Sequence, residues 1–285
     1  MLRIAIQSSG RIKSETLELL ERVGVKISHF GDTTFIAKSS DFPAVVYFVD
    51  NHNAPCWTME GLVDVCICCQ FALNINDIDE KNIIRRLGYD KTTLSFLVPA
   101  ETKYEGVKWF NGRSIATPYP ELVNQFLKKN ALKATVRHMN EQAYQSVNVG
   151  IADAVFDRIY SGTSLFNGHL REAEKYLTSE AVMVLSPKIT PAKSLILDEL
   201  LSRIDSVIAS RNKKFVSMNV PADKIDRICE LVPSLCSQNI TNSLDPKWVT
   251  ISTVMDDTRL WDIVEKLRML GVREIIACPI DNLIV

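Results

Sequence analysis

The sequence IADAVFDRIYSGTSLFNG, residues 151–168, joins an apolar segment that carries two acids to a short run of Ser, Gly and Thr. The acids are Asp153 and Asp157, and the polar run is Ser161-Gly162-Thr163-Ser164. The apolar segment is typical of a buried strand. A Ser/Gly/Thr turn that opens a helix offers unpaired backbone N–H groups to an anion. We therefore predict a phosphate-binding turn directly after a strand.

The residue types around this turn favour a sugar phosphate as the ligand. Gly162 lets the backbone approach a ligand closely, and Ser161, Thr163 and Ser164 add hydroxyl donors. Asp157 can accept hydrogen bonds from sugar hydroxyls beside the phosphate. On spacing alone, a plain helix N-cap at Ser161 accounts for the same residues equally well.

Composition and charge narrow the class of protein. The chain has 285 residues and is 46% hydrophobic, which is enough for two or three domains with real cores. Lys and Arg number 33 against 34 Asp and Glu, so we expect no nucleic-acid partner. No apolar run reaches the roughly 20 residues of a membrane span, so we expect no membrane partner. The opening MLRIAIQSSGR is typical of a strand rather than of a signal peptide, which predicts a cytoplasmic protein.

A metal site is the alternative interpretation of the cysteine cluster Cys66-Ile67-Cys68-Cys69. Side chains alternate along a strand, so the sulfurs of this cluster point to two different faces. Tetrahedral sites usually draw pairs of ligands two to four residues apart, with partners elsewhere, and His52 is the only nearby candidate. We predict no metal site from this pattern.

Alternating strand and helix patterns predict an α/β fold with parallel-rich sheets covered on both faces. The predicted strands of the first part are residues 3–7, 34–37, 44–49, 63–68, 94–98, 114–117, 134–137 and 152–156, and the predicted helices are 14–22, 120–129 and 141–147. Pro99, with the polar residues 100–106 after it, is predicted to cross between two lobes.

The last part of the chain has a different pattern. After a strand at 181–185 and a long helix at 195–210, the order β-α-β-β-α-β follows within residues 215–277. That order is the split βαβ pattern of a ferredoxin-like domain. Its predicted elements are 215–219, 222–231, 239–242, 248–254, 258–270 and 274–277.

Five stretches of the sequence resemble the ATP phosphoribosyltransferase family, which performs the first step of histidine biosynthesis. GIADAVFDRIYSGTSL, residues 150–165, resembles its phosphoribosyl-pyrophosphate signature. The other stretches are LRIAIQSSGRI (2–12), MEGLVDVCICC (59–69), RSIATPYPELVNQFL (113–127) and GVREIIACPIDNL (271–283). The resemblance covers essentially the whole chain and implies the long form of that enzyme.

The long form implies two lobes folded like type II periplasmic binding proteins and a C-terminal ferredoxin-like βαββαβ domain. We expect lobe I at residues 1–98 and 170–212, lobe II with the phosphate-binding turn at 99–169, and the regulatory domain at 213–285. The resemblance also implies a homo-oligomer, either a dimer or a hexamer.

The implied reaction is transfer of phosphoribose from phosphoribosyl pyrophosphate, or another sugar phosphate, to ATP or a related acceptor. Pyrophosphate is released, and Mg²⁺ is the implied cofactor. The implied substrate-binding residues are Gly10, Arg11, Asp153, Asp157, Tyr160, Ser161, Gly162, Thr163 and Ser164. The implied residues for a histidine effector are Gln238, Asn239 and Ile240. No catalytic side chain and no metal ligand follow from the resemblance.

Several positions depart from the family pattern. Family cations are replaced at Ser8, Phe48, Asp50 and Thr93, the family Gly-Glu-Asn is Cys69-Gln70-Phe71, a family Glu is Tyr144, and the family RPTI is SQNI at 237–240. A charge-assisted hydrogen bond is worth about 1.5–3 kcal/mol, so losing four cations would weaken polyphosphate binding severely. The cations that could compensate are Arg11, His52, Lys91 and Arg158.

Two functions follow from these observations. The favoured one is an active phosphoribosyltransferase. The alternative is a catalytically impaired member that binds a phosphorylated metabolite or regulates an active transferase. A solute-binding protein is less well supported because no secretion signal is present. Phe48, Trp57 and Phe71 are expected to pack in the core, because large aromatic side chains are mostly buried.

Overall fold

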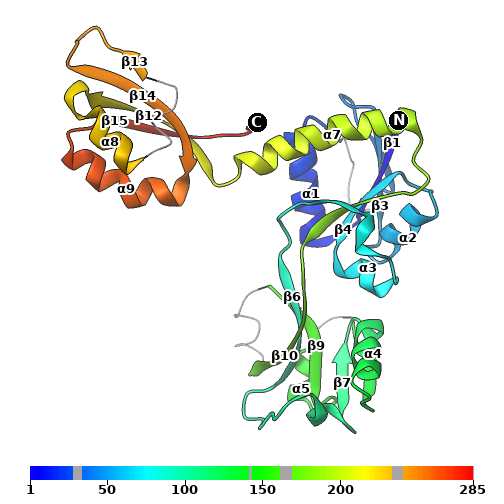
Figure 1. Ribbon diagram of the computed structural model, residues 1–285. Helices are drawn as coiled ribbons and strands as arrows, with labels where there is room; N and C mark the ends of the chain where they lie inside the picture. Colours follow the sequence, from blue (N-terminus) through cyan, green and yellow to red (C-terminus); the bar gives the residue numbers. More distant parts are fainter. Residues whose placement is uncertain (28–33, 141–142, 161–168, 233–239, 285) are drawn as a thin grey trace. The chain divides into compact units, whose positions relative to one another are not determined.

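The computed structural model describes residues 1–27, 34–140, 143–160, 169–232 and 240–284 (Figure 1). The chain divides into two compact units, Met1–Asp198 and Glu199–Val285, and each is described by itself. None of the helices in the described ranges combines the length and the apolar character that a membrane crossing requires.

The first sheet of the N-terminal unit forms lobe I and has the strand order β2-β3-β1-β4-β11-β5. β1 runs parallel to β3 and β4, whereas β2, β11 and β5 are antiparallel to their neighbours. β4 is buried at every position, which explains its uninterrupted apolar sequence VCICC. The strands are β1 (Leu2–Gln7), β2 (Ile36–Lys38), β3 (Ala44–Val49), β4 (Val65–Cys69), β5 (Ile83–Arg86) and β11 (Ala181–Leu185).

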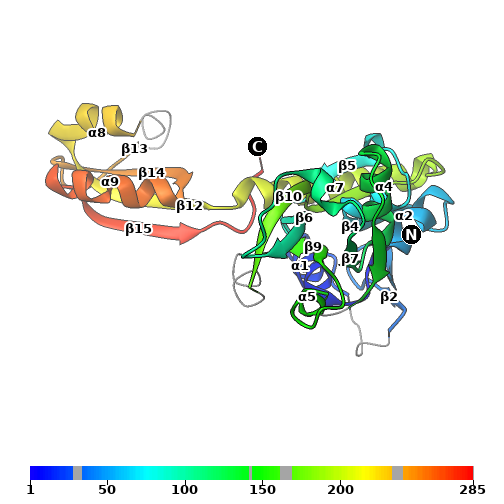
Figure 2. The same ribbon diagram turned by 90° about the horizontal axis from the view of Figure 1, so that it is seen from below.

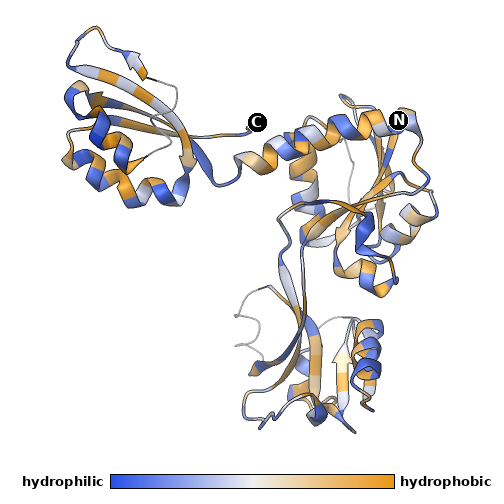
Figure 3. Cartoon of the chain, viewed as in Figure 1, coloured by the Kyte–Doolittle hydropathy of each residue, from blue (hydrophilic) through white to orange (hydrophobic). Residues whose placement is uncertain are grey.

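A helix follows each of the parallel strands β1, β3 and β4 of lobe I. Because these strands are parallel, they end at the same edge of the sheet. The helices are α1 (Gly10–Arg22) after β1, α2 (Asn53–Met59) after β3 and α3 (Phe71–Ile75) after β4. α1 begins four residues earlier than predicted, at Gly10, whose φ of 78° suits glycine. In Figure 3 the strands at the centre of this unit are mostly in the hydrophobic colour, in keeping with their burial.

The second sheet forms lobe II and has the strand order β10-β6-β9-β7-β8. β7 runs parallel to β8 and β9, and β6 is antiparallel to both β9 and β10. Phe96 lies at the centre of its core, with ring centroids of Phe110, Phe126 and Phe156 at 4.9, 4.3 and 4.5 Å. The elements are β6 (Thr92–Pro99), β7 (Ser114–Thr117), α4 (Pro120–Lys129), β8 (Thr135–His138), α5 (Gln145–Asn148), β9 (Ala154–Ile159) and β10 (Leu170–Ser179).

The crossing between the lobes differs from the prediction. Pro99 does not lie at a crossing, because it pairs with Leu170 inside the second sheet. β6 and β10 both belong to lobe II, so the chain leaves lobe I after Arg86 and returns at about Glu180. The sheets are mixed rather than parallel-rich. β10 escaped prediction because its sequence LREAEKYLTS carries charges throughout, and its pairing with β6 has two register shifts.

The C-terminal unit has the predicted β-α-β-β-α-β order, with the strand order β13-β14-β12-β15. Burial alternates along β12 and β14, and their buried positions pack with Ile228 of α8 and with Leu260, Ile263 and Leu267 of α9. Figures 1 and 2 show both helices against the sheet. The elements are β12 (Lys213–Pro221), α8 (Ile225–Leu231), β13 (Ile240–Asn242), β14 (Trp248–Asp256), α9 (Asp257–Met269) and β15 (Arg273–Pro279).

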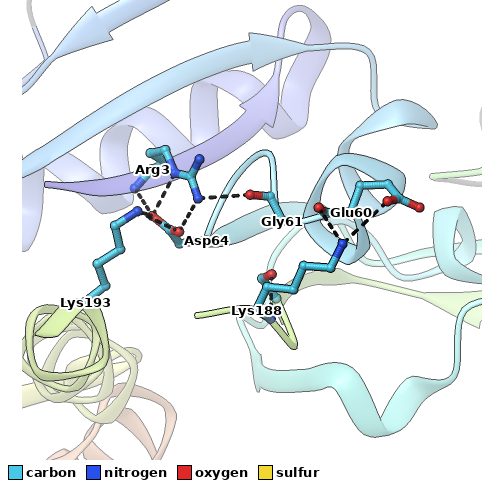
Figure 4. Close-up of polar contacts among 7 residues, drawn as sticks. Arg3, Glu60, Gly61, Asp64, Lys188 and Lys193 are labelled. Carbon is cyan, nitrogen blue, oxygen red and sulfur yellow. Dashed lines mark hydrogen bonds and ion pairs between the residues drawn. The ribbon is translucent and has the colours of Figure 1, made fainter. Parts of the chain in front are cut away.

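The two compact units divide inside helix α7 (Pro191–Ser210), after Asp198. Lys193, in the first turn of α7, donates to both carboxylate oxygens of Asp64 at 3.0 and 2.8 Å. Arg3 of β1 binds the same carboxylate, with its Nη2 at 2.7 Å from Oδ1 (Figure 4). Asp64 precedes β4 and is 2% exposed. This cluster therefore fastens α7 to lobe I at the amino ends of β1 and β4.

Replacing Asp64 is expected to destabilise the protein in a pH-dependent way. Burial opposes ionisation of Asp64, but the hydrogen bonds from Arg3 and Lys193 outweigh it and hold the pKa below its usual value. The stabilisation is therefore fully present above the unfolded-state pKa of about 3.9 and is lost as the pH falls below it. Asp64→Asn should lower the free energy of unfolding at pH 7 by about 3–5 kcal/mol in urea titrations.

At pH 3 the difference between Asp64→Asn and the wild type should shrink. Asp41→Asn is the control, because Asp41 is half-exposed and lies 3.6 Å from Lys26. It should change stability by less than about 1 kcal/mol. Equal effects of the two substitutions would contradict a structural role for the Asp64 cluster.

Candidate functional site

An aromatic cluster joins the two lobes at the carboxyl ends of the lobe I strands. Phe71 opens α3 in lobe I, and Tyr119 precedes α4 in lobe II, with 5.1 Å between their ring centroids. His52 lies 6.3 Å from the Phe71 ring and 6.1 Å from the Tyr119 ring. Phe71 is 1% exposed. The lobes of this unit are thus in direct contact through buried rings.

A buried ion pair lies beside this aromatic cluster. Arg158 of β9 places Nη2 at 2.8 Å from Oδ2 of Asp90, and the two side chains are 13% and 1% exposed. Cys69, at the end of β4, donates its thiol to the same oxygen at 3.1 Å. Burial raises the pKa of the Cys69 thiol, which keeps it protonated as a donor. The pair therefore connects lobe II with the crossing segment and lobe I.

A cavity of about 380 Å³ opens next to the crossing segments, and charges of both signs line it. Arg86 Nη1 donates to Gln70 at 2.8 Å and lies 3.4 Å from Glu180. Lys91 lines the cavity and has no ion-pair partner within the described residues. The lining residues are Gln70, Arg86, Lys91, Thr92, Thr93, Ile159, Tyr160, Thr178, Ser179 and Glu180. Five hydroxyl side chains among them suit a polar, hydrogen-bonding ligand.

Among the described residues of the sequence-predicted site, Tyr160 lines this cavity. Asp157 shares a face of β9 with the lining residue Ile159. Burial raises the pKa of the Asp157 carboxyl, although a hydrogen bond from the Arg158 backbone N–H at 2.7 Å opposes this. The Arg11 guanidinium lies 5.8 Å from the Tyr160 ring and forms an ion pair with Glu15 at 3.0 Å. Gly10 begins the same helix as Arg11.

Asp153 lies apart from the other predicted residues. Its carboxylate accepts hydrogen bonds from the Ser114 backbone N–H at 2.8 Å and the Ser114 hydroxyl at 2.7 Å. The backbone bond is the main reason that the pKa of Asp153 lies below its usual value. Asp153 precedes β9, and a strand rises about 3.3 Å per residue, so Asp153 and Asp157 are separated by about 13 Å. The structure gives Asp153 the role of joining β7 to the start of β9.

The remaining predicted residues are not all within the described part of the chain. Ser161, Gly162, Thr163 and Ser164 lie outside the described residues, as do Gln238 and Asn239. Ile240 is the first residue of β13 and is 45% exposed.

Four of the substituted positions lie either in the core or at the cavity. Phe48 and Phe71 are buried, as expected, while Trp57 is half-buried. The Lys13 ammonium lies 5.4 Å from the Phe48 ring. Gln70 and Thr93 line the cavity. Two positions at which the resemblance implies a polar residue, Phe48 and Phe71, are therefore packed in the interior. Two others, Gln70 and Thr93, line the cavity.

Asp90, Arg86 and Glu180 were not predicted as site residues. They flank the points where the chain passes between the two sheets, and they meet the site only because β6 and β10 belong to lobe II. The polar sequence LGYDKT, residues 87–92, was a visible turn signal. Assigning the crossing to Pro99 kept this segment away from the predicted site.

Comparison with known proteins agrees with the resemblance along the whole chain. The family model described as ATP phosphoribosyltransferase matches residues 51–206, and the model described as HisG, C-terminal domain, matches residues 210–282. ATP phosphoribosyltransferases of Bacteroides fragilis and Parabacteroides distasonis are 36% and 35% identical to this chain over 285 residues. Each comparison covers 100% of both chains. The chain belongs to the ATP phosphoribosyltransferase family.

A solved structure supports the fold of this family member. The ATP phosphoribosyl transferase (HisG:HisZ) complex from Thermotoga maritima matches with a TM-score of 0.62 at 16% identity. The match covers 72% of this chain and 96% of that chain. The predicted α/β architecture is confirmed.

Removing the Phe71 ring tests whether the aromatic cluster holds the lobes together. Phe71→Ala should lower the free energy of unfolding by about 3–5 kcal/mol, because a fully buried ring is lost from the interlobe contact. Chemical denaturation monitored by circular dichroism measures this change. Phe35→Ala is the control, because Phe35 also contacts two rings, Tyr47 and Trp57, but is 50% exposed. A similar small loss of stability in both variants would contradict the prediction that the aromatic cluster holds the lobes together.

Proposed function

We propose that this protein transfers phosphoribose from phosphoribosyl pyrophosphate to ATP or a related acceptor and releases pyrophosphate. The observation that carries the proposal is 36% identity over the full length to a protein named ATP phosphoribosyltransferase. The cavity lined by Tyr160 and Lys91 supports it, since it opens next to the carboxyl end of β9, the strand that carries Asp157.

Displacing pyrophosphate from the ribose C1 requires two phosphorylated substrates to be held together with their charge neutralised. In this proposal the predicted turn at residues 161–164 holds the 5′-phosphate. Asp157 accepts hydrogen bonds from the ribose hydroxyls. Lys91 and Arg86 of the cavity, with Arg11 in the first turn of α1, offset the charge of the phosphates. Arg158 adds little net charge because Asp90 neutralises it.

A magnesium requirement belongs to the proposal through the family resemblance. Within the described residues, no group of three or more His, Cys, Asp or Glu is arranged to hold a metal ion. The described residues therefore do not fit a resident magnesium site. Mg²⁺ is commonly bound through substrate phosphates, so the ion would enter on the pyrophosphate oxygens.

The family also suggests regulation and assembly. We include in the proposal a histidine effector acting on the C-terminal unit, a homo-oligomer that is a dimer or a hexamer, a place in histidine biosynthesis and a cytoplasmic location. These features are inherited from the family, and Ile240 is the described residue of the predicted effector site.

The activity is tested by pyrophosphate release. Purified protein mixed with phosphoribosyl pyrophosphate, Mg²⁺ and ATP should release pyrophosphate, whereas a Ser161→Ala/Thr163→Ala double variant should be slower by at least tenfold. Binding of both substrates without any release would favour the catalytically impaired member. Neither binding nor release with ATP, other purines or azoles would reject both functions.

Restoring a cation in the cavity should tighten substrate binding. Thr93 lines the cavity at a position where the family carries Arg. A charge-assisted hydrogen bond of about 1.5–3 kcal/mol predicts that Thr93→Arg lowers KM for phosphoribosyl pyrophosphate about tenfold or more. Thr135→Arg, on exposed β8, is the matched control and should leave KM unchanged. An equal KM in both variants would mean that the cavity does not receive the phosphates.

A further inference from the structure

The Asp90–Arg158 pair is not arranged for stability alone. Within the described residues, Asp90 Oδ1 and Arg158 Nε are buried and have no hydrogen-bond partner. Buried polar atoms without partners are uncommon in native structures and call for an explanation. Asp90 has a φ of 50°, in the left-handed region where Asp and Asn are enriched. The unpartnered atoms of the pair are therefore the feature that calls for a functional explanation.

The same pair fixes the ring of Tyr160. The Arg158 guanidinium lies 4.6 Å from the Tyr160 ring centroid and 5.1 Å from that of Phe71. Arg11 adds a second guanidinium, 5.8 Å from the Tyr160 centroid. Cations over aromatic faces attract the ring electrostatically, most strongly where water is excluded. Tyr160 is therefore oriented by Arg158, which Asp90 holds in turn.

Tyr160 is well suited to donate a hydrogen bond to an anion. It lines the 380 Å³ cavity together with Lys91 and is 46% exposed, so a ligand can reach it. Burial of part of the side chain raises the pKa of the phenol to about 12. A phenol keeps its proton at neutral pH even at the ordinary tyrosine pKa of about 10, so the Tyr160 hydroxyl is available as a donor.

We propose that Tyr160 is a ligand-binding residue that donates its phenolic hydrogen bond to the phosphorylated sugar in this cavity, and that Asp90 and Arg158 are its positioning residues. This inference rests on the proposed function and adds to it a side chain that stands where the family has a small residue.

The test measures binding of ribose 5-phosphate and phosphoribosyl pyrophosphate by calorimetry. Tyr160→Phe keeps the ring between the two arginines and removes only the hydroxyl, so Kd should rise about tenfold or more, as for a lost hydrogen bond to a charged group. Tyr104→Phe is the matched control, because Tyr104 is part-buried and donates to Glu174 at 3.1 Å in lobe II. It should leave both Kd values unchanged.

The positioning residues are tested separately. Arg158→Met and Asp90→Asn should weaken ligand binding because each leaves Tyr160 without its positioning pair. In a protein that already carries Tyr160→Phe, neither substitution should weaken binding further. Arg158→Lys keeps the charge opposite Asp90 and should recover part of the affinity of Arg158→Met. A purely structural role would instead lower the thermal midpoint in every variant without this dependence on Tyr160.

The outcomes separate this inference from the proposed function. If the wild type binds the probes and Tyr160→Phe binds them with the same Kd, the role of Tyr160 is overturned and the proposed function stands. Equal losses in Tyr160→Phe and Tyr104→Phe would overturn it as well. Wild-type protein that binds neither probe would overturn the proposed function and this inference together.

Discussion

The arrangement of the N-terminal unit depends on one buried ion pair, Arg158 with Asp90. Removing two charges from water is costly, and the cost is recovered only where geometry and further hydrogen bonds are good. Here the 2.8 Å contact, the Cys69 thiol on the same oxygen and the ring of Phe71 recover part of this cost, while Asp90 Oδ1 and Arg158 Nε have no hydrogen-bond partner within the described residues. Because the two residues belong to β9 and to the crossing segment, the pair sets how the ends of the two sheets meet.

This constraint explains how the substituted positions are accommodated. Where the family carries a polar Asn, Phe71 packs against Tyr119 and against the Arg158 guanidinium. The site thus has aromatic packing around an arginine that Asp90 neutralises. The cavity has two cations, Lys91 and Arg86, and Arg86 lies 3.4 Å from Glu180.

Local sequence predicted the fold well wherever one element is decided by its own pattern. β3, β7, β11 and α4 have the bounds that apolar periodicity and Pro120 indicate. β10 and the crossing segments were missed, because a charged antiparallel strand has no local signature. Asp157 and Tyr160 are predicted as site residues from a contiguous motif, and Tyr160 lines the cavity. Asp90 and Arg158 are 68 residues apart, so their pairing depends on sheet topology, which the sequence pattern does not specify.

A double-mutant cycle on Asp90 and Arg158 tests the central claim most directly. The free energy of unfolding is measured in urea at pH 7 for the wild type, Asp90→Asn, Arg158→Met and the double variant. Residues that act as one unit should show a coupling energy of about 2 kcal/mol or more, with the double variant close to either single variant. A coupling energy below about 0.5 kcal/mol would show that the two side chains act independently and would contradict the account.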